Sequence, residues 1–100
     1  MSGYSVYVIP SAWREIKGLP GHVRHRVKRA IDELEDDPHP PGSRKLEAPE
    51  DIPGELWRIR LENWRIVYAI SEADNVIDVL AVRRRPPYDY GDLETLLSEL

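Results

Sequence analysis

The chain of 100 residues contains no cysteine, no phenylalanine and a single methionine. The absence of cysteine excludes disulfide bonds, thiolate zinc sites and cysteine nucleophiles, and it is consistent with a reducing compartment. No apolar run approaches the roughly 20 residues that a membrane-spanning helix needs, and the N-terminus lacks the pattern of a secretory signal peptide. We therefore expect a cytoplasmic protein without membrane partners, folded as one domain over residues 1–100.

The chain also lacks a net positive charge, because its formal charge at pH 7 is −4. The charges are nevertheless segregated along the sequence. Three consecutive arginines occupy positions 83–85, whereas the segment 89–100 carries acids and no base. The distribution of charge, rather than its sum, decides which ligands a surface attracts. A basic face can therefore exist on this acidic protein.

The hydrophobic pattern predicts an α+β fold with the element order β-α-α-β-β-β-α. Residues 4–9 are rich in β-branched and aromatic side chains and form a first strand. Residues 11–18 and 20–34 follow the helical period and form a hairpin of two helices. The runs 56–61, 64–70 and 76–82 are joined by polar connections, as in an antiparallel meander. A last helix begins near Asp92.

Residues 37–53 contain five of the nine prolines and are predicted to form a loop or an extended crossing. The first strand is expected to join the meander at an edge. The product is a small curved antiparallel sheet, with the helical hairpin covering one face.

Alternation along the predicted strands gathers arginines on one face, and the run Arg83–Arg85 after the last strand of the meander is expected to converge with them. In the run 56–61, Arg58 and Arg60 point away from Trp57, Ile59 and Leu61, and Arg65 lies opposite the apolar side of the next strand. Guanidinium forks match phosphate oxygens, so a polyanion is the natural ligand of such a cluster. The alternative is that each arginine covers apolar surface or forms a local ion pair.

The remaining polar residues give weaker signals. His22 and His25 are three residues apart on a predicted helix but lack a third ligand, and His39 is expected to be exposed. We therefore predict no metal site and no cofactor. No serine–histidine–acid arrangement, P-loop or glycine-rich nucleotide motif is visible.

Four segments, YSVYVIPSAWREI, RKLEA, LWRIRLENWRIVYAI and VLAVRRRPPYDY, resemble the RelE/ParE toxin superfamily, and the resemblance covers nearly the whole chain. RelE-type toxins cleave mRNA, commonly in the ribosomal A site, whereas ParE-type toxins inhibit DNA gyrase. The resemblance implies a RelE-like fold and a metal-independent endoribonuclease that acts on mRNA, with the ribosome as a further partner, and that is neutralised by a cognate antitoxin. Two alternatives are a non-enzymatic ParE-like gyrase inhibitor and an inactive homologue that binds an antitoxin.

The resemblance also implies roles for residues in the middle of the chain. Arg65 matches the arginine that binds the scissile phosphate, and Arg58 and Arg60 match two basic residues on the second strand. Glu47 falls near the carboxylate base of the YoeB-type toxins. Lys45, in the same segment, is assigned a contact with RNA.

Further roles fall on the C-terminal part. Either Arg84 or Arg85 matches a later catalytic arginine, and either Tyr88 or Tyr90 matches a C-terminal tyrosine. One tyrosine would stack on an unpaired base, and the other would pack the last helix onto the sheet. Arg83 and Tyr90 are expected to contact RNA.

The implied reaction needs a base for the attacking 2′-hydroxyl, an acid for the leaving 5′-oxygen and cations for the pentacoordinate phosphate. Some RelE enzymes have lysine where this chain has Arg60, and arginine cannot readily accept a proton. Three possibilities follow: Glu47 is the base, the enzyme relies on positioning and electrostatics, or the chain is not a nuclease.

Overall fold

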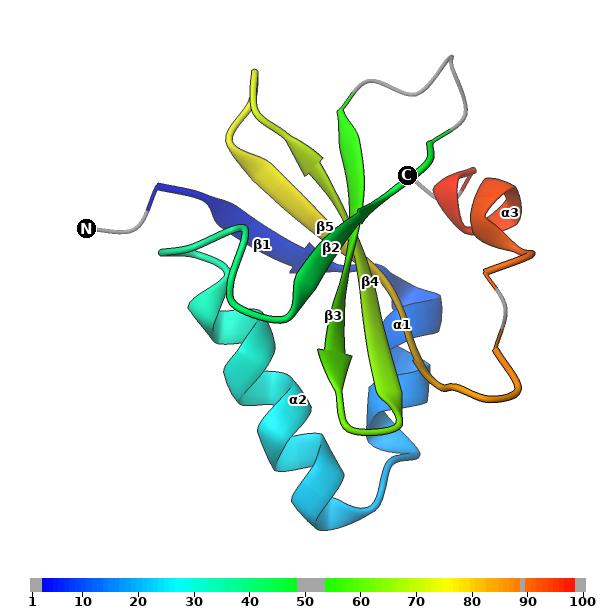
Figure 1. The fold of residues 1–100 in the computed structure, drawn as a ribbon. Helices are drawn as coiled ribbons and strands as arrows, with labels where there is room; N and C mark the ends of the chain where they lie inside the picture. Colours follow the sequence, from blue (N-terminus) through cyan, green and yellow to red (C-terminus); the bar gives the residue numbers. More distant parts are fainter. Residues whose placement is uncertain (1–2, 49–53, 89, 99–100) are drawn as a thin grey trace.

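The computed structural model describes residues 3–48, 54–88 and 90–98 (Figure 1). It confirms the α+β class and the N-terminal helical hairpin. The elements follow one another as β1 (Ser5–Val8), α1 (Pro10–Lys17), α2 (Gly21–Glu33), β2 (Ser43–Leu46), β3 (Glu55–Leu61), β4 (Trp64–Ser71), β5 (Val76–Arg84) and α3 (Leu93–Leu97).

The prediction of a loop over residues 37–53 is wrong at Ser43–Leu46, which forms β2. This strand has only four residues, and it exists because it pairs with β3, with Leu46 opposite Leu56. Tertiary pairing of this kind overrides local propensity. The sheet therefore gains a strand that the local pattern of prolines and charges concealed.

The strands form one sheet in the order β1-β5-β4-β3-β2. Strands β2 to β5 pair as an antiparallel meander, and β1 joins β5 at the edge, as predicted. The expectation of an entirely antiparallel sheet is corrected at that edge, because β1 and β5 run parallel. A parallel pair needs a long connection, which the helical hairpin and the meander together provide.

The helical hairpin covers one face of the sheet, and the C-terminal segment lies on the other. Val6 and Val8 of β1 share a hollow with Ile31 of α2, so the face that carries them is the hairpin face. Ile16 of α1 and Val27 of α2 are fully buried in the same core cluster as the strands. None of the helices in the described part of the chain is long and apolar enough to cross a membrane.

Candidate functional site

Cross-strand pairing gathers arginines on the sheet face opposite the hairpin. Arg60 on β3 pairs with Arg65 on β4, which pairs in turn with Arg83 on β5. One step along the sheet, Arg44 on β2 pairs with Arg58 on β3. Directly paired residues project from the same face of a sheet. Four strands therefore contribute guanidinium groups to one surface, which we call the arginine face.

A small hollow on this face is lined by Gly42, Ser43, Arg44, Arg58 and Arg60, and its volume is about 210 Å³. Arg58 Nη1 donates a hydrogen bond of 3.1 Å to the carbonyl oxygen of Gly42, which orients its guanidinium. Among the described residues, no carboxylate forms an ion pair with the three arginines. The hollow thus presents uncompensated positive charge.

The pKa of Arg58 is affected by the other positive charges around it. Burial lowers the pKa of Arg58, and although the neighbouring Tyr90 phenol opposes this, the cations Arg44, Arg65 and Arg60 lower it further. A bound anion would relieve the mutual repulsion of these groups. Because a guanidinium stays charged at every physiological pH, the hollow is suited to a phosphate group.

Arg65 is the least accessible residue of the arginine face, with only 8% of its surface exposed. Its Nη1 donates to the carbonyl oxygens of Glu62 at 2.9 Å and Trp64 at 3.0 Å. Glu62 has a positive φ of 55° in the turn between β3 and β4. Part of the guanidinium of Arg65 therefore supports that turn as well as the charged surface.

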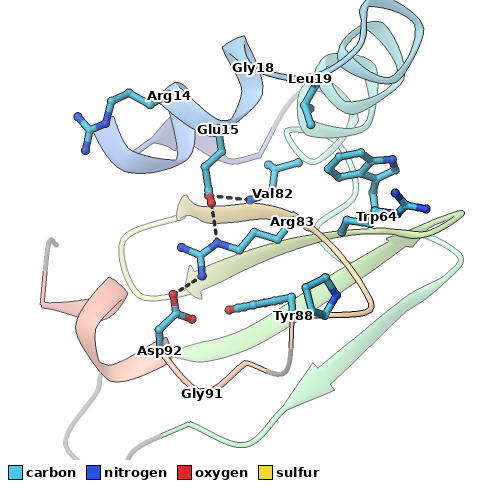
Figure 2. A pocket seen from close by; sticks show the side chains of 12 residues that line it. Arg14, Glu15, Gly18, Leu19, Trp64, Val82, Arg83, Tyr88, Gly91 and Asp92 are labelled. Carbon is cyan, nitrogen blue, oxygen red and sulfur yellow. Dashed lines mark hydrogen bonds and ion pairs between the residues drawn. The ribbon is translucent and has the colours of Figure 1, made fainter.

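Arg83 belongs to the same face but has its own carboxylate partners (Figure 2). Its Nε donates to Glu15 Oε2 of α1 at 2.5 Å, and its Nη1 pairs with Asp92 Oδ2. The Tyr88 ring lies 4.9 Å from the guanidinium carbon. Burial lowers the pKa of Arg83, but the two carboxylates outweigh burial and raise it. Arg83 thus ties α1 and the C-terminal segment to β5.

The two following arginines lie in different places. Arg84 pairs with Trp64, which places it on the hairpin face. Both residues line a larger pocket of about 750 Å³ between α1, the end of β5 and the segment after it (Figure 2). Arg85 lies over the Tyr90 ring, 5.1 Å from its centroid. The expectation that Arg83, Arg84 and Arg85 converge with the strand arginines therefore agrees with the pairing of Arg83 and is wrong for Arg84, whereas Arg85 lies beyond the end of β5, beside Tyr90.

Tyr88 and Tyr90 pack against each other, with ring centroids 4.9 Å apart in an edge-on arrangement. Both hydroxyl groups are buried, and neither has a hydrogen-bond partner among the described residues. Burial and the neighbouring Asp92 carboxylate raise the pKa of Tyr88. In this conformation the two tyrosines hold the C-terminal segment against the arginine face, and Leu96 and Leu97 of α3 are buried with them.

Lys45 and Glu47 lie apart from the arginine face. Lys45 pairs with Trp57, so it projects from the opposite face, where its Nζ lies 3.2 Å from Glu55 Oε2. Glu47 is exposed just beyond the end of β2. It is three residues from Arg44, or about 10 Å along an extended chain.

Arg44 is the arginine of the hollow that was not predicted from the sequence. It lies within the stretch predicted as a loop, where no alternation between two sheet faces was expected. The local sequence Ser-Arg-Lys-Leu carries no polar–apolar alternation that could have revealed the strand. Only the register with β3 shows that Arg44 shares a face with Arg58.

Comparison with solved structures places the fold among RelE toxins. The chain is similar to RelE in the archaeal RelE–RelB complex from Pyrococcus horikoshii OT3, with 27% identity, a TM-score of 0.74 and coverage of 86% of this chain and 99% of that one. It also resembles the RelBE2 toxin–antitoxin complex of Mycobacterium tuberculosis, at 21% identity and a TM-score of 0.67, over 83% and 99% of the two chains. For the isolated RelE toxin of E. coli, the identity is 22% and the TM-score 0.67, over 97% and 99%.

Comparison with curated protein sequences gave no match. A family model, by contrast, matches residues 6–86, and it describes the ParE toxin of the type II toxin–antitoxin system parDE. The matched region includes the hairpin, the whole meander and every residue of the arginine face. The chain therefore belongs to the ParE toxin family and is a toxin of the RelE/ParE superfamily of type II toxin–antitoxin systems.

Proposed function

We propose that this toxin cleaves mRNA and that the arginine face holds the phosphates of the RNA. The observation that carries the proposal is the 210 Å³ hollow, in which Arg44, Arg58 and Arg60 have no carboxylate partner among the described residues. Guanidinium groups from two adjacent strands can bind a phosphate from two sides. Arg65, at the base of the same surface, adds a further positive charge.

The proposed reaction is attack of a ribose 2′-hydroxyl on the adjacent phosphorus. The P–O bond to the 2′-oxygen forms and the bond to the 5′-oxygen breaks, while the proton of the 2′-hydroxyl is lost to solvent water and the leaving 5′-oxygen takes one up from it, which leaves a cyclic phosphate and a 5′-hydroxyl. Arg58 and Arg60 stabilise the dianionic transition state, where a preorganised donor is worth about 2.7–4 kcal/mol. Because Glu47 lies outside the hollow, we assign most of the catalysis to positioning and electrostatics, and Glu47→Ala tests for a base.

We propose that the C-terminal segment moves when RNA binds along the arginine face. Tyr90 acts electrostatically on Arg58, and Asp92 is paired with Arg83, so this segment competes with RNA for the face. Once released, Tyr88 or Tyr90 can stack on an unpaired base. Arg83 and Arg85 would then be free to contact the RNA backbone.

A cognate antitoxin is the proposed protein partner. The similar structures from P. horikoshii and M. tuberculosis are complexes of RelE-type toxins with antitoxins. We propose that the antitoxin lays an acidic or amphipathic segment over the arginine face, or displaces α3 from it. In either mode the antitoxin segment would occupy the surface that is proposed to bind RNA.

The direct test is to induce the chain in cells and map the 5′ ends of the transcripts, with the assay repeated in a reconstituted system with and without ribosomes. Wild type should produce discrete cuts, and Arg58→Ala combined with Arg60→Ala should abolish them. Arg29→Ala is the matched control, because it removes one exposed guanidinium from α2, away from the arginine face. Intact transcripts at full wild-type expression would refute the proposal.

Inhibition of DNA gyrase is the second candidate, and the match of residues 6–86 to the ParE model favours it. Supercoiling of plasmid DNA by purified gyrase distinguishes the two. Under the gyrase hypothesis, the chain stops supercoiling and leaves RNA intact. A chain that affects neither process but binds its antitoxin would instead be an inactive homologue.

A further inference from the structure

At the end of the sheet where β3 begins, three side chains from separate segments meet. The ligand atoms of His39, Glu55 and Glu72 all lie within 4.8 Å of one another. His39 lies between α2 and β2, Glu55 is the first residue of β3, and Glu72 follows β4. We propose that these three side chains bind a divalent transition-metal cation, with Zn²⁺ as the best fit. The inference is independent of the function proposed above.

The fold brings the three residues together by backbone contacts. Glu55 pairs with Ile70, two residues before Glu72. Gly54 has a φ of +107°, and a Cβ atom there would lie 2.2 Å from the Ile70 oxygen, so β3 starts directly against the end of β4. On the other side, the Tyr68 hydroxyl donates to the Pro38 oxygen at 2.8 Å, which holds the residue before His39 against the sheet.

Trp57 orients two of the three ligands. Its Nε1 donates a hydrogen bond of 3.0 Å to Glu55 Oε1, and its ring lies 4.4 Å from the His39 imidazole. The backbone N–H of His39 also donates to Asp37 Oδ1 at 3.0 Å. Outer contacts of this kind position metal ligands in known sites. Contacts with neighbouring residues therefore fix the positions of Glu55 and His39 in the cluster.

The donor set suits zinc. One imidazole nitrogen and two carboxylate oxygens are common Zn²⁺ ligands, and water can complete the tetrahedron. Bonds of about 2.0–2.2 Å place the ligand atoms about 3.3 Å apart, so the group must contract slightly. His39 and Glu72 are both exposed, and rotation of their side chains can supply the contraction.

The local charge also favours a cation. Glu55 and Glu72 repel each other, and Asp37 and Asp74 lie in the adjoining segments. Lys45 is the competing group, because its Nζ lies 3.2 Å from Glu55 Oε2. Its side chain is 58% exposed, so it can turn toward solvent when a metal binds. A divalent cation would offset more of this negative charge than the single ammonium does.

Metal binding at this position would fasten the loop between α2 and β2 to the sheet. His39 is three residues before Gly42, whose carbonyl orients Arg58 in the arginine hollow. The cation would therefore stabilise one wall of the hollow from the opposite face. Binding to the folded state alone raises the thermal midpoint according to the concentration of free metal.

The test is calorimetric titration of the full-length chain with Zn²⁺, together with thermal unfolding. We expect one Zn²⁺ per chain and a raised midpoint that EDTA reverses. His39→Ala and Glu72→Gln should each weaken binding at least about tenfold, since each removes a ligand. Trp57→Phe keeps the ring and removes the donor to Glu55, so it should weaken binding by about 10–100-fold.

The matched control is the double variant His22→Ala/His25→Ala, which removes the other two histidines of the chain, both on α2. It should leave zinc binding unchanged. Absence of saturable binding by the wild-type chain would overturn the proposal, as would wild-type affinity in both His39→Ala and Glu72→Gln. Loss of binding in the α2 double variant alone would assign the zinc to an adventitious site and would also overturn it.

Discussion

The arginine face contains two groups of guanidiniums that differ in one respect. Arg44, Arg58 and Arg60 lie around the hollow without a described carboxylate partner, whereas Arg83 is held between Glu15 and Asp92. All four project from the same side of neighbouring strands. The difference therefore comes from the elements packed beside them: the described residues of α1 and the C-terminal segment bring acids to Arg83 and form no ion pair in the hollow.

This contrast indicates that Arg83 stabilises the fold, whereas the arginines around the hollow are available to a ligand. An ion pair between partly buried groups contributes to folding, and removing one partner leaves the other charge uncompensated. A cluster of like charges without counterions opposes folding, and a bound anion reverses its effect. Substitutions in the two groups should accordingly change different properties: activity around the hollow, and stability around Arg83.

The largest expected effect is on RNA cleavage by the hollow. Arg58→Ala should slow cleavage of a defined transcript by about 100–1000-fold, because one preorganised cation is lost from the transition state. Primer extension gives the rate, and thermal unfolding of the same variant should be close to wild type. Cleavage at the wild-type rate by Arg58→Ala would remove the hollow from the mechanism.

A smaller effect, on stability, is expected for the paired arginine. Arg83→Ala leaves Glu15 and Asp92 without their common cation and should cost about 2 kcal/mol of unfolding free energy. For a chain of this size that corresponds to a fall of about 8–16 °C in the thermal midpoint. Differential scanning calorimetry measures it. An equal fall in Arg58→Ala would show that the two groups do not differ as described.

The pair with Asp92 should also give stability a dependence on pH. Burial opposes ionisation of Asp92, but the neighbouring Arg83 and Tyr88 outweigh burial and hold its pKa below the ordinary value of 3.8. A lowered pKa in the folded state contributes stability that is present above the ordinary value and is lost as the pH falls through the lowered one.

Asp92→Asn removes this contribution. We therefore expect the variant to be less stable than wild type by about 1 kcal/mol near pH 7, with the difference shrinking as the pH falls below about 4. Urea unfolding at a series of pH values measures it. A difference that stays constant down to about pH 2 would show that the carboxylate is not the group responsible.

The smallest effect concerns the stability of the hollow itself. Arg44→Ala and Arg60→Ala remove exposed like charges, so each should change the unfolding free energy by less than about 0.5 kcal/mol, with a stabilising sign. Added salt should remove the difference, because it screens the repulsion. A clear loss of stability in either variant would reveal a structural partner for that arginine.

Much of the fold could be predicted from the sequence, because apolar residues recur with a clear period in α2 and in the long strands of the meander. The positions Val23, Val27, Ile31 and Leu34 follow the helical period and are buried as that period requires. The alternation in β3 correctly separated Arg58 and Arg60 from Ile59. The strand Ser43–Leu46 was missed, since four residues between prolines carry too little pattern to outweigh the loop signal.

The candidate site was harder to predict, because it depends on register and on partners distant in sequence. The sequence run Arg83–Arg85 suggested one cluster, but alternation sends Arg84 to the hairpin face. Glu15 precedes Arg83 by most of the chain, and Asp92 follows the end of the strand that carries Arg83. No local sequence pattern links either acid to this arginine. Likewise, His39 was expected to be merely exposed, and its proximity to Glu55 and Glu72 is a product of the fold.

The most direct test of the central claim is the salt dependence of RNA binding. The binding constant is measured at several salt concentrations with an RNA that cannot be cleaved, because it carries 2′-deoxy substitutions. Its logarithm is then plotted against the logarithm of the salt concentration. Each lost phosphate contact lowers the slope by about 0.7 on a single strand. We predict this decrease for Arg58→Ala and a larger one for Arg44→Ala/Arg58→Ala, with no change for the exposed α2 control Arg29→Ala. Equal slopes in all of these proteins would contradict the assignment of phosphate binding to the hollow.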